Sequence, residues 1–415
     1  MGYENTKRIL VVSPFPISYP PRDGHSLNVI YRSYFLKVFA NVNSDIIVSE
    51  NSDYSARDLI NSGIFDNVFT YYTKSKWKSL VKSLFSQMTH LMIRYDMSNV
   101  ELKRIIDVIS ENKYQAVIFD HSCSYPLYNK LMNHIKVDGE KQSKIIYWSH
   151  NIDYIDSKVI GSESDNPLKK LIHYITSKKL EKIEPEYIRK FSKIISVSSH
   201  EVNILRKINP AAKIWWIPPI LPEPKKDEFV DEKFISEISG KVKDYKYKIL
   251  FVGLLNKPSN ILPCIWFANY VLPIIKNNLD GKLCFLIVGK DTSKEIFNLA
   301  ENNKDILVFP NVSSVLPFYK LADLVVIPIF NPSGIKLKLI EALKYRKKVV
   351  ARPETLLGAG LENIVPSATD PQDFAKKCIQ AIQGKIDYEP IWNKFEQIYD
   401  NKKIVDKLMG IIELA

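Results

Sequence analysis

The chain is poor in cysteine, and its cysteines form none of the patterns that tie a fold to disulfides or to a thiolate-bound metal. Four are scattered over 415 residues, and no two form a CxxC pair: Cys123, Cys264, Cys284 and Cys378. A disulfide framework and a cysteine-based zinc site are therefore excluded as the basis of the fold. Scattered thiols are typical of a reducing compartment, so we expect a cytoplasmic protein.

Long apolar runs are missing as well. No segment reaches the roughly 18 uninterrupted apolar residues that a membrane-spanning helix needs. The first residues, MGYENTKRILVVSPFP, lack the ordered basic, apolar and small-residue regions of a signal peptide. Their short apolar run therefore predicts a first strand.

Common nucleotide and nucleic-acid motifs are also absent. The chain has no P-loop, no Cys/His finger, no RNP-like aromatic strand and no recognisable helix-turn-helix. The Gly-Ala-Gly of Gly358–Gly360 lacks the third glycine of a dinucleotide-binding fingerprint. Nucleic-acid binding is therefore a distant alternative, and we expect no such partner.

Charge of one sign is in excess. There are 58 Lys and Arg against 46 Asp and Glu, so the formal net charge is +12. Such an excess indicates an anionic partner, either nucleic acid, acidic lipid or a phosphorylated small molecule. With 46% hydrophobic and 25% charged residues, the composition is that of a globular protein.

One basic stretch, residues 67–95, contains no Asp or Glu. It carries cations and apolar residues at helical spacing: Lys74, Lys76, Lys78, Lys82 and Arg94, with Trp77, Leu80, Val81, Leu84, Phe85, Met88, Leu91 and Met92. A basic amphipathic helix around Lys74–Arg94 can lie on an anionic membrane surface. A core helix with a basic edge would give the same pattern, so both interpretations stay open here.

Short β-branched runs alternate with amphipathic stretches along the whole chain, which predicts doubly wound parallel sheets of the α/β class. The predicted strands are Arg8–Ser13, Asp45–Ser49, Gln115–Phe119, Lys144–Trp148, Lys193–Val197, Lys248–Val252, Lys282–Val288, Asp305–Phe309, Leu324–Ile329 and Lys347–Ala351.

A proline-rich and charged segment, Pro218–Ser239, divides these strands into two groups. We predict an N-terminal domain (residues 1–220), a linker (221–245), a C-terminal domain (246–390) and a final helix (391–415) that packs back on the N-terminal domain. Both domains would be Rossmann-like and would face a cleft. Ligands of such sheets bind beyond the carboxyl ends of the strands.

The most informative segment is Leu324–Ala351, in which a buried strand, a turn and a helix follow one another. Ser333 would cap the helix, and Gly334 would let a ligand approach the backbone. The N–H groups of Gly334, Ile335 and Lys336 would then form an anion site. Lys338 and Glu341 would share one helix face, where Glu341 could bind a diol such as a ribose. An ordinary strand–helix crossover with a surface ion pair is the alternative.

This segment, SGIKLKLIEALKYRKKVVA, resembles the donor-site signature of retaining glycosyltransferases of the GT4 type, which have the GT-B fold. Four further segments are similar to motifs of that family and occur in its order: PPRDG at Pro20–Gly24, HNID at His150–Asp153, FVGLLNKPSNILPCIWFANYVLPIIK at Phe251–Lys276 and IVGKD at Ile287–Asp291. Together they indicate the superfamily and leave the sugar open.

The resemblance implies that the second domain binds a nucleotide-sugar donor. Gly253 would let the backbone approach the diphosphate, and the basic Lys257 and Lys290 lie in neighbouring loops. The Pro310-Asn311-Val312 loop would recognise the base. Backbone N–H groups of Ser333, Gly334 and Ile335 would bind the β-phosphate, Lys336 or Lys338 would add charge, and Glu341 would hold the ribose.

The resemblance assigns the first domain to the acceptor. Gly24 would face the β-phosphate across the cleft, and His150 would lie near the sugar and acceptor, so that His150, Lys336 and Glu341 form the catalytic set. The other expected acceptor-side residues are His25, Asn28, His121, Asn151 and Asp153.

Two positions depart from the family pattern. Many relatives carry two glutamates eight residues apart, and Ser333 stands where the first of them would be. Asn28 stands where several relatives have an arginine. These departures keep a catalytically silent binding protein as an alternative to the enzyme, together with a nucleotide-sugar epimerase.

The implied activity is transfer of a sugar from a UDP- or GDP-linked donor to a saccharide or lipid-linked glycan with retention. Bacterial surface polysaccharide synthesis at the inner face of the cytoplasmic membrane is the implied setting. No Asp-x-Asp motif is present, so we expect neither a metal nor another cofactor. The partners would be the donor, the glycan acceptor and an anionic membrane surface.

Overall fold

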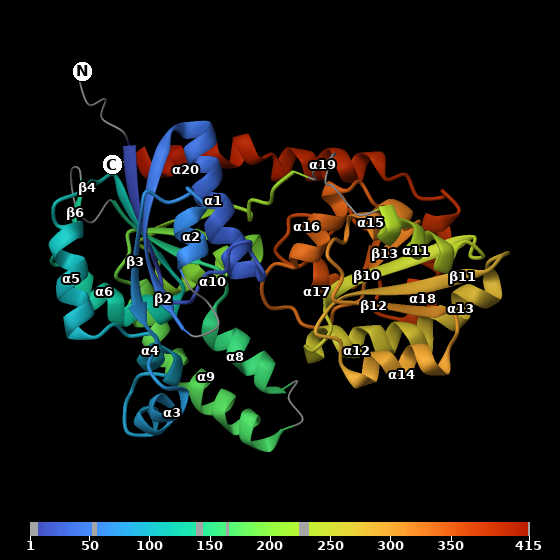
Figure 1. Ribbon diagram of the computed structural model, residues 1–415, viewed down its shortest axis with the longest axis horizontal. Helices are drawn as coiled ribbons and strands as arrows, with labels where there is room; N and C mark the ends of the chain where they lie inside the picture. Colours follow the sequence, from blue (N-terminus) through green and yellow to red (C-terminus); the bar gives the residue numbers. More distant parts are fainter. Residues whose placement is uncertain (1–6, 52–55, 138–143, 163–165, 224–231, 414–415) are drawn as a thin grey trace. The chain divides into compact units, whose positions relative to one another are not determined.

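A computed structural model describes residues 7–51, 56–137, 144–162, 166–223 and 232–413 of the chain (Figure 1). The chain forms two compact units. The first consists of Met1–Leu221 together with Tyr399–Ala415, and the second of Pro222–Ile398. Each unit is an α/β structure with a parallel sheet at its centre, as the sequence predicts.

The first unit contains a seven-stranded sheet in the order β3-β2-β1-β5-β7-β8-β9, and every pairing in it is parallel. Its central strands are buried on both faces, which explains their nearly continuous Val and Ile content. The strands are β1 (Lys7–Ser13), β2 (Val42–Glu50), β3 (Asn67–Tyr72), β5 (Ala116–Asp120), β7 (Ile145–Ser149), β8 (Lys193–Ser196) and β9 (Lys213–Trp216), and the short β4 (Lys113–Tyr114) pairs separately with β6 (Lys136–Val137).

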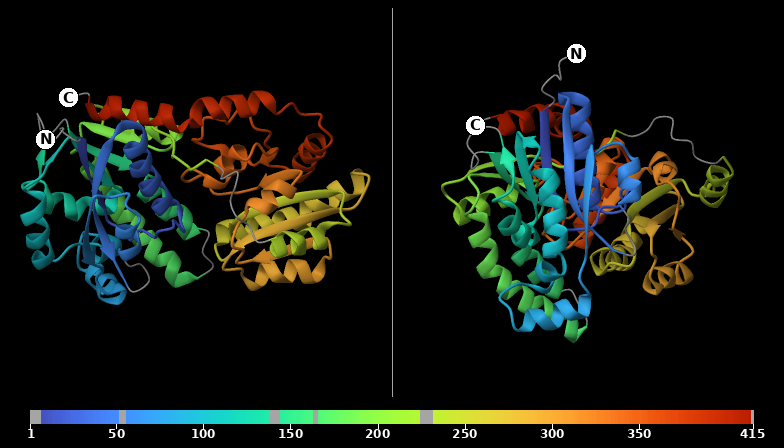
Figure 2. Two further views of the ribbon diagram at one scale, coloured as in Figure 1. Left: turned by 45° about the horizontal axis from the view of Figure 1, so that its top comes forward. Right: turned by 60° about the vertical axis from the view of Figure 1, so that its left-hand side comes forward.

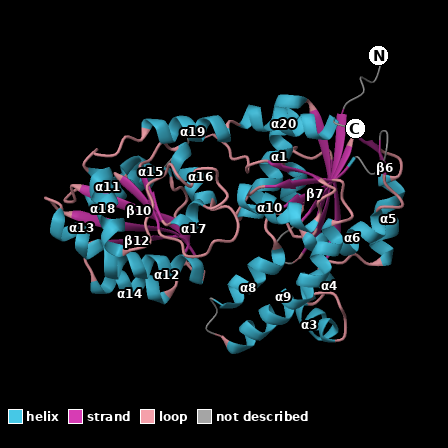
Figure 3. Cartoon of the chain, turned by 180° about the vertical axis from the view of Figure 1, so that it is seen from behind, coloured by secondary structure: helices cyan, strands magenta, loops and turns pink. Residues whose placement is uncertain are grey.

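Helices cover both faces of this sheet (Figure 3). One continuous apolar core joins alternate strand residues such as Leu10, Val117 and Tyr147 to one set of helices. That set is α5 (Asn99–Ile109), α6 (Tyr125–Leu131), α9 (Pro167–Ile188) and α10 (Ser199–Ile208). The other helices of the unit are α1 (Gly24–Ala40), α2 (Arg57–Asn61), α3 (Lys76–Leu84), α4 (His90–Arg94), α8 (Asp153–Ser162), α20 (Asn401–Glu413) and the 3-10 turn Ser122–Ser124.

The second unit has a five-stranded parallel sheet in the order β12-β11-β10-β13-β14. Figure 2 shows its strands in yellow to orange. The strands are β10 (Tyr247–Leu254), β11 (Leu283–Lys290), β12 (Ile306–Pro310), β13 (Leu324–Ile327) and β14 (Val349–Ala351). The helices are α11 (Glu232–Val242), α12 (Pro258–Trp266), the π-helical Phe267–Val271, α13 (Leu272–Asn278), α14 (Lys294–Asn302), α15 (Leu316–Leu321), α16 (Leu337–Lys344), α17 (Pro353–Leu356), α18 (Pro371–Ile382) and α19 (Glu389–Tyr399).

Pro258–Asn278 is long and apolar enough to span a membrane by length and composition alone. Its inward residues, among them Cys264, Phe267 and Leu272, are fully buried within the second unit. The segment contacts β10 and α18. We therefore interpret it as a core helix of this unit.

All ten predicted strands are present, with ends shifted by one to three residues. The sequence did not predict β3, β9 and the two-residue β4 and β6. Strand β3 lies inside the basic stretch, whose helix-like spacing concealed an alternating NVFTYY run. The predicted single helix there is wrong, because Thr89 starts a new helix by accepting a hydrogen bond from the Met92 N–H.

Two predictions about connecting segments also need correction. The predicted linker contains helix α11, whose Ile238 and Val242 are buried four residues apart; residues 224–231 of that linker lie outside the described part. The predicted final helix is two helices, α19 and α20. Asp400 separates them, because its carboxylate caps the second helix at the Lys403 N–H, 2.8 Å away.

Helix α20 belongs to the first unit, where it contacts α1. Long-range hydrogen bonds fix it there. Asn401 Nδ2 donates to the Leu221 carbonyl at 2.9 Å, and Lys193 Nζ donates to the Ile411 carbonyl at 2.8 Å. Asn401 is the first residue of the helix and Ile411 lies near its end, so these two bonds fix both ends of α20 within the first unit.

A close contact between two glycines joins the central strands of the second unit. Gly253 of β10 and Gly289 of β11 are register partners. A Cβ placed on Gly289 would lie 1.7 Å from the Gly253 carbonyl oxygen. Only glycine fits at this position, because the obstacle is rigid backbone.

We expect Gly289→Ala to destabilise the second unit by about 3 kcal/mol or more, since the strands would have to separate. Thermal and urea unfolding of the full chain measure this. Gly240→Ala is the matched control. It lies in helix α11 with no atom within 4 Å of its added Cβ, so it should raise stability slightly, by about 0.5 kcal/mol. Equal effects of the two substitutions would contradict the proposed constraint.

Candidate functional site

The first unit places three histidines at the carboxyl ends of three adjacent strands. His25 follows β1 at the start of α1, His121 follows β5, and His150 follows β7. The rings of His121 and His150 stack with centroids 4.2 Å apart. His25 meets both rings, and its Nδ1 is 3.1 Å from His121 Nε2. The structure thus joins three residues that the sequence analysis treated one by one.

A buried ion pair supports this cluster through His150. The carboxylate of Asp120 accepts two hydrogen bonds from the Arg32 guanidinium, at 3.0 and 2.8 Å. It also lies 2.9 Å from His150 Nε2, and Arg32 lies 4.3 Å above the ring of Trp148. Arg32 and Asp120 are 1% and 0% exposed. The sequence analysis missed both, although Asp120 directly follows the predicted strand Gln115–Phe119 and so was detectable.

The electrostatics of the pair fix the state of His150. Burial alone would raise the pKa of Asp120, but Arg32 and the His150 hydrogen bond hold that pKa well below its ordinary value. Burial, followed by the neighbouring His121, lowers the pKa of His150 to about 4 despite Asp120. A neutral His150 must donate its Nε2–H to the ionised Asp120, which leaves Nδ1 as a hydrogen-bond acceptor.

The remaining expected acceptor-side residues have structural partners. Asp153 accepts hydrogen bonds from the N–H and the hydroxyl of Ser122. Glu184 accepts from the backbone N–H groups of Asp153 and Tyr154, both at 2.9 Å, and so caps α8. The Asn151 carbonyl accepts from Ser149 Oγ. These contacts shape the loop after β7 around the histidines.

Asn28 and Gly24 lie on α1. Asn28 is buried, and its Oδ1 has no hydrogen-bond partner in the described part of the chain. Gly24 is the first residue of the helix, directly after Asp23, whose carboxylate caps the helix by accepting from the Ser26 N–H at 2.8 Å. The PPRDG segment is therefore a helix start at the same sheet edge as His25.

In the second unit, the turn after β13 differs from the sequence prediction. Helix α16 begins at Leu337, and Ser333 does not cap it. The Ser333 N–H donates instead to Asn331 Oδ1 at 2.7 Å, and Gly334 has φ +64°. Lys336 Nζ donates to the carbonyls of Ser333 and Gly334. The ammonium satisfies the turn's own carbonyls, so the helix and its N–H groups start three residues later than predicted.

Lys338 is the second residue of α16, and its side chain reaches the carboxyl end of β10. Its Nζ donates to Asn260 Oδ1 at 2.5 Å and lies 4.4 Å from the centre of the Phe251 ring. A Cβ on Gly253 would be 3.0 Å from Nζ, so the glycine makes room for the cation. Burial lowers the pKa of Lys338 to about 7. Asn260, which the sequence analysis left unassigned, positions it.

Glu341 lies one turn further along α16. Its Oε2 accepts a hydrogen bond from the Tyr319 hydroxyl at 2.9 Å, and Tyr319 stacks on Tyr345 with centroids 4.5 Å apart. Burial raises the pKa of Glu341. The carboxylate of Glu341 is partly buried and accepts this hydrogen bond through one oxygen. Its other oxygen can accept hydrogen bonds from the hydroxyl groups of a ligand. Tyr319 carried no signal in the sequence.

The loop expected to recognise the base is also built by backbone contacts. Asn311 has φ +51°, its N–H donates to the Gly289 carbonyl at 2.6 Å, and its Oδ1 accepts from the Asp291 N–H at 3.0 Å. Pro310 and Val312 flank it. Lys257 and Lys290 are exposed, before α12 and at the end of β11. All these positions share the carboxyl edge of the sheet.

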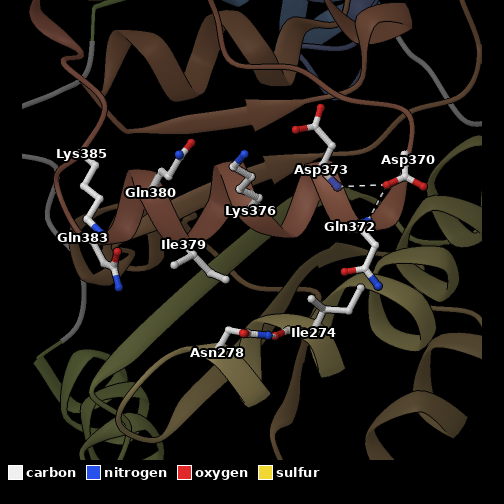
Figure 4. A pocket seen from close by; sticks show the side chains of 10 residues that line it. All are labelled: Ile274, Asn278, Asp370, Gln372, Asp373, Lys376, Ile379, Gln380, Gln383 and Lys385. Carbon is white, nitrogen blue, oxygen red and sulfur yellow. Dashed lines mark hydrogen bonds between the residues drawn. The ribbon is translucent and has the colours of Figure 1, made fainter.

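A separate polar groove opens between α13 and α18 (Figure 4). Gln372 and Ile379 of α18 point toward Ile274 and Asn278 of α13, and Asp370, just before α18, also lines the groove. None of the predicted site residues lines this groove. Asp370 has a structural role, because its Oδ1 accepts the N–H groups of Gln372 and Asp373 at the helix start.

Comparison with known proteins first defines the class. The fold is that of GT-B glycosyltransferases. The glycosyltransferase from Rickettsia africae has a TM-score of 0.64 at 13% identity, covering 99% of this chain and 98% of that one. Anabaena Alr3699/HepE, in a structure with UDP, has a TM-score of 0.61 at 12% identity and covers 99% and 100%.

A family model matches part of the second unit. Residues 246–384 match the model of glycosyl transferases group 1, the group to which the sequence motifs are similar. A relative over the whole length is a Klebsiella pneumoniae protein described as an uncharacterized 44.6 kDa protein in the cps region. It is 23% identical over 97% of this chain and 98% of its own.

The Arg32–Asp120 pair provides a test of the first unit. We expect Arg32→Met or Asp120→Asn to lower the free energy of unfolding by about 3–5 kcal/mol, because each leaves a buried polar group without its partner. The combined substitution should cost less than the sum. Chemical denaturation measures all three.

Asp406→Asn is the control for this test. Its exposed pair with Lys402 on α20 should contribute less than about 1 kcal/mol. If the buried single variants were no less stable than Asp406→Asn, the pair would not be the anchor of the histidine cluster.

Proposed function

We propose that the protein is a glycosyltransferase that moves a sugar from a nucleotide diphosphate donor to a saccharide or lipid-linked glycan, with retention of configuration. The observation that supports this most strongly is the grouping of Lys338, Glu341 and Gly253 at one strand edge, inside the family-matched segment 246–384. A nucleotide diphosphate needs a cation for its phosphates, a glycine that lets it approach the backbone, and a carboxylate that accepts hydrogen bonds from the ribose hydroxyls.

The residues suggest how the reaction would proceed. Breaking the bond between sugar and phosphate places additional negative charge on the departing diphosphate. Lys338 and the N–H groups at the start of α16 would stabilise that charge, and a single oriented donor can contribute about 3 kcal/mol. Glu341 would hold the ribose. In this proposal the protein's own cation and N–H groups bind the diphosphate, without a metal.

The comparisons support two finer points of the proposal. A structure of Alr3699/HepE contains UDP, which favours UDP over GDP as the donor nucleotide. The cps-region relative favours a role in bacterial surface polysaccharide synthesis. The first unit would then hold the acceptor, at the sheet edge where the three histidines lie.

A catalytically silent nucleotide-binding homologue is the second candidate. Ser333 provides no carboxylate where many relatives have a glutamate, and its N–H is already used by Asn331. A protein that binds a nucleotide but transfers nothing would match these two facts. Turnover of donor by the isolated protein separates this candidate from the enzyme.

The donor site can be tested with a thermal-shift panel of UDP, GDP, CMP, ADP and dTDP on the full chain. One nucleotide, expected to be UDP, should stabilise the fold by about 2.7 kcal/mol at 100 times its Kd. Lys338→Met and Glu341→Gln should remove most of this shift. The exposed Lys376→Met and Glu301→Gln are matched controls and should keep it.

The outcomes of the panel are decisive for the proposal. A shift that survives Lys338→Met and Glu341→Gln would refute the assigned donor site. Nucleotide binding without sugar transfer to any glycan fraction would favour the silent homologue. Conversion of donor without any glycan would instead indicate the epimerase.

We further propose that the protein lies on the anionic inner face of the cytoplasmic membrane through helix α3. This helix buries polar side chains and exposes apolar ones, the opposite of a core helix. Its buried residues are Ser79 and Ser83, whereas Trp77 and Phe85 are 74% and 89% exposed. The exposed apolar side rules out the core-helix interpretation for α3, while Met92 further along the stretch is buried in the core.

The surroundings of α3 favour an anionic lipid surface. Exposed Lys76, Lys78 and Lys82 border the apolar stripe of Trp77, Val81 and Leu84. Lys179 of α9 donates to the Ser83 and Ser86 carbonyls and so fixes the C-terminal end of the helix. The helix is therefore held with its apolar side outward and its cations beside it, as interfacial helices are.

Sedimentation with vesicles tests this second proposal. Binding to vesicles rich in phosphatidylglycerol should fall by roughly tenfold or more in Trp77→Ala/Phe85→Ala, because apolar area is lost. Lys78→Gln/Lys82→Gln should weaken it by roughly 2 kcal/mol, since each lysine contributes about 1 kcal/mol. Tyr270→Ala, exposed in the second unit, should have no effect. Equal binding to uncharged vesicles would contradict the proposal.

A further inference from the structure

The histidine cluster of the first unit has the geometry of a metal site. A ring nitrogen from each of His25, His121 and His150 lies within 4.8 Å of the others. His25 Nδ1 and His121 Nε2 are 3.1 Å apart. Two nitrogens bound to a tetrahedral zinc ion at about 2.0–2.1 Å would be separated by about 3.3 Å. The observed pair is therefore already close to the spacing of two ligands.

The outward nitrogens of the same rings face oxygen atoms. His25 Nε2 is 2.8 Å from Ser13 Oγ, and His150 Nε2 is 2.9 Å from Asp120 Oδ1. His121 Nδ1 lies 3.9 Å from Asp153 Oδ1. Histidines that bind metals almost always donate their second ring N–H to such an oxygen, which orients the ring and raises its basicity. Here the rings of His25 and His150 have this arrangement at hydrogen-bond distance, and the ring of His121 faces a carboxylate at 3.9 Å.

The anchors of these oxygens are rigid. Asp120 is held by both nitrogens of the buried Arg32, and Asp153 by the N–H and hydroxyl of Ser122. Ser13 ends β1, one of the three central strands. An ion that replaced the proton between His25 and His121 would meet two nitrogens that already point toward each other.

We propose that His25, His121 and His150 bind one divalent transition-metal ion of the zinc class. Three imidazole nitrogens select zinc or cobalt over magnesium or calcium, which prefer oxygen. Because His121 and His150 are stacked with only 10° between their planes, one ring turns about its Cβ–Cγ bond to direct its lone pair at the ion. A fourth position stays open for water or a ligand oxygen, as in three-ligand zinc sites.

This site is distinct from the donor site and from the proposed handling of the diphosphate without a metal. The sequence analysis expected no metal because the chain has no Asp-x-Asp motif. The three histidines are 96 and 29 residues apart along the chain. That spacing belongs to no known short metal motif. Only the parallel pairing of β1, β5 and β7 brings them together.

Titration of the tag-free full chain with Co²⁺, followed by its visible absorption, tests the proposal. We expect one ion per chain, an absorption band of tetrahedral intensity, and displacement by Zn²⁺. His25→Ala and His121→Ala should each weaken binding by at least about 100-fold, and Ser13→Ala by about 10-fold. The exposed His134→Ala and His200→Ala are matched controls and should bind like the unchanged protein.

Each other outcome overturns the inference. No cobalt band in the unchanged protein, or a band that survives His25→Ala, would exclude the site, and loss of the band in His134→Ala would show surface chelation only. Circular dichroism and the thermal midpoint establish that each variant is folded. The nucleotide shift is read on the same samples, so failure to bind metal and failure to bind nucleotide are separate results.

Discussion

Parallel strand pairing is the constraint on which both candidate sites depend. In a parallel sheet all carboxyl ends lie at one edge, so loops from distant parts of the chain meet there. In the first unit the edge collects His25, His121 and His150, and in the second it collects Gly253, Asn311 and the turn before α16. The contact of Gly289 with the Gly253 carbonyl shows how tightly that alignment is set in the second unit.

The buried charged side chains at the carboxyl edges of the two sheets have different neighbours. In the first unit Arg32 donates two hydrogen bonds to Asp120 and helps to hold the pKa of that carboxyl well below its ordinary value, so Asp120 stays ionised near neutral pH. In the second unit Lys338 has a neutral amide and an aromatic ring as neighbours, and burial lowers its pKa to about 7. An anionic ligand would favour its charged form. The Arg32–Asp120 pair orients the His150 ring, whereas Lys338 has no anionic partner among these neighbours.

Helix α3 shows that an amphipathic pattern does not state which side faces inward. The spacing of Trp77, Val81 and Leu84 is that of a core helix, yet these residues point outward and two serines are buried. Lys179 makes this possible by holding the helix end through backbone carbonyls instead of through apolar contact. Met92, further along the same stretch, is buried and packs in an apolar cluster with Cys123, Leu180 and Ile183.

The sequence by itself determined the α/β class, the ten main strands and the order of strand, turn and helix in Leu324–Ala351, because buried parallel strands and their following turns leave a local pattern. It did not determine where α16 begins, since the Lys336 ammonium occupies the turn carbonyls. Nor did it reveal Arg32, Asn260 and Tyr319, whose roles come from partners 88, 78 and 22 residues away. Those contacts exist only after the strands pair, so tertiary structure alone decided which side chains support each site.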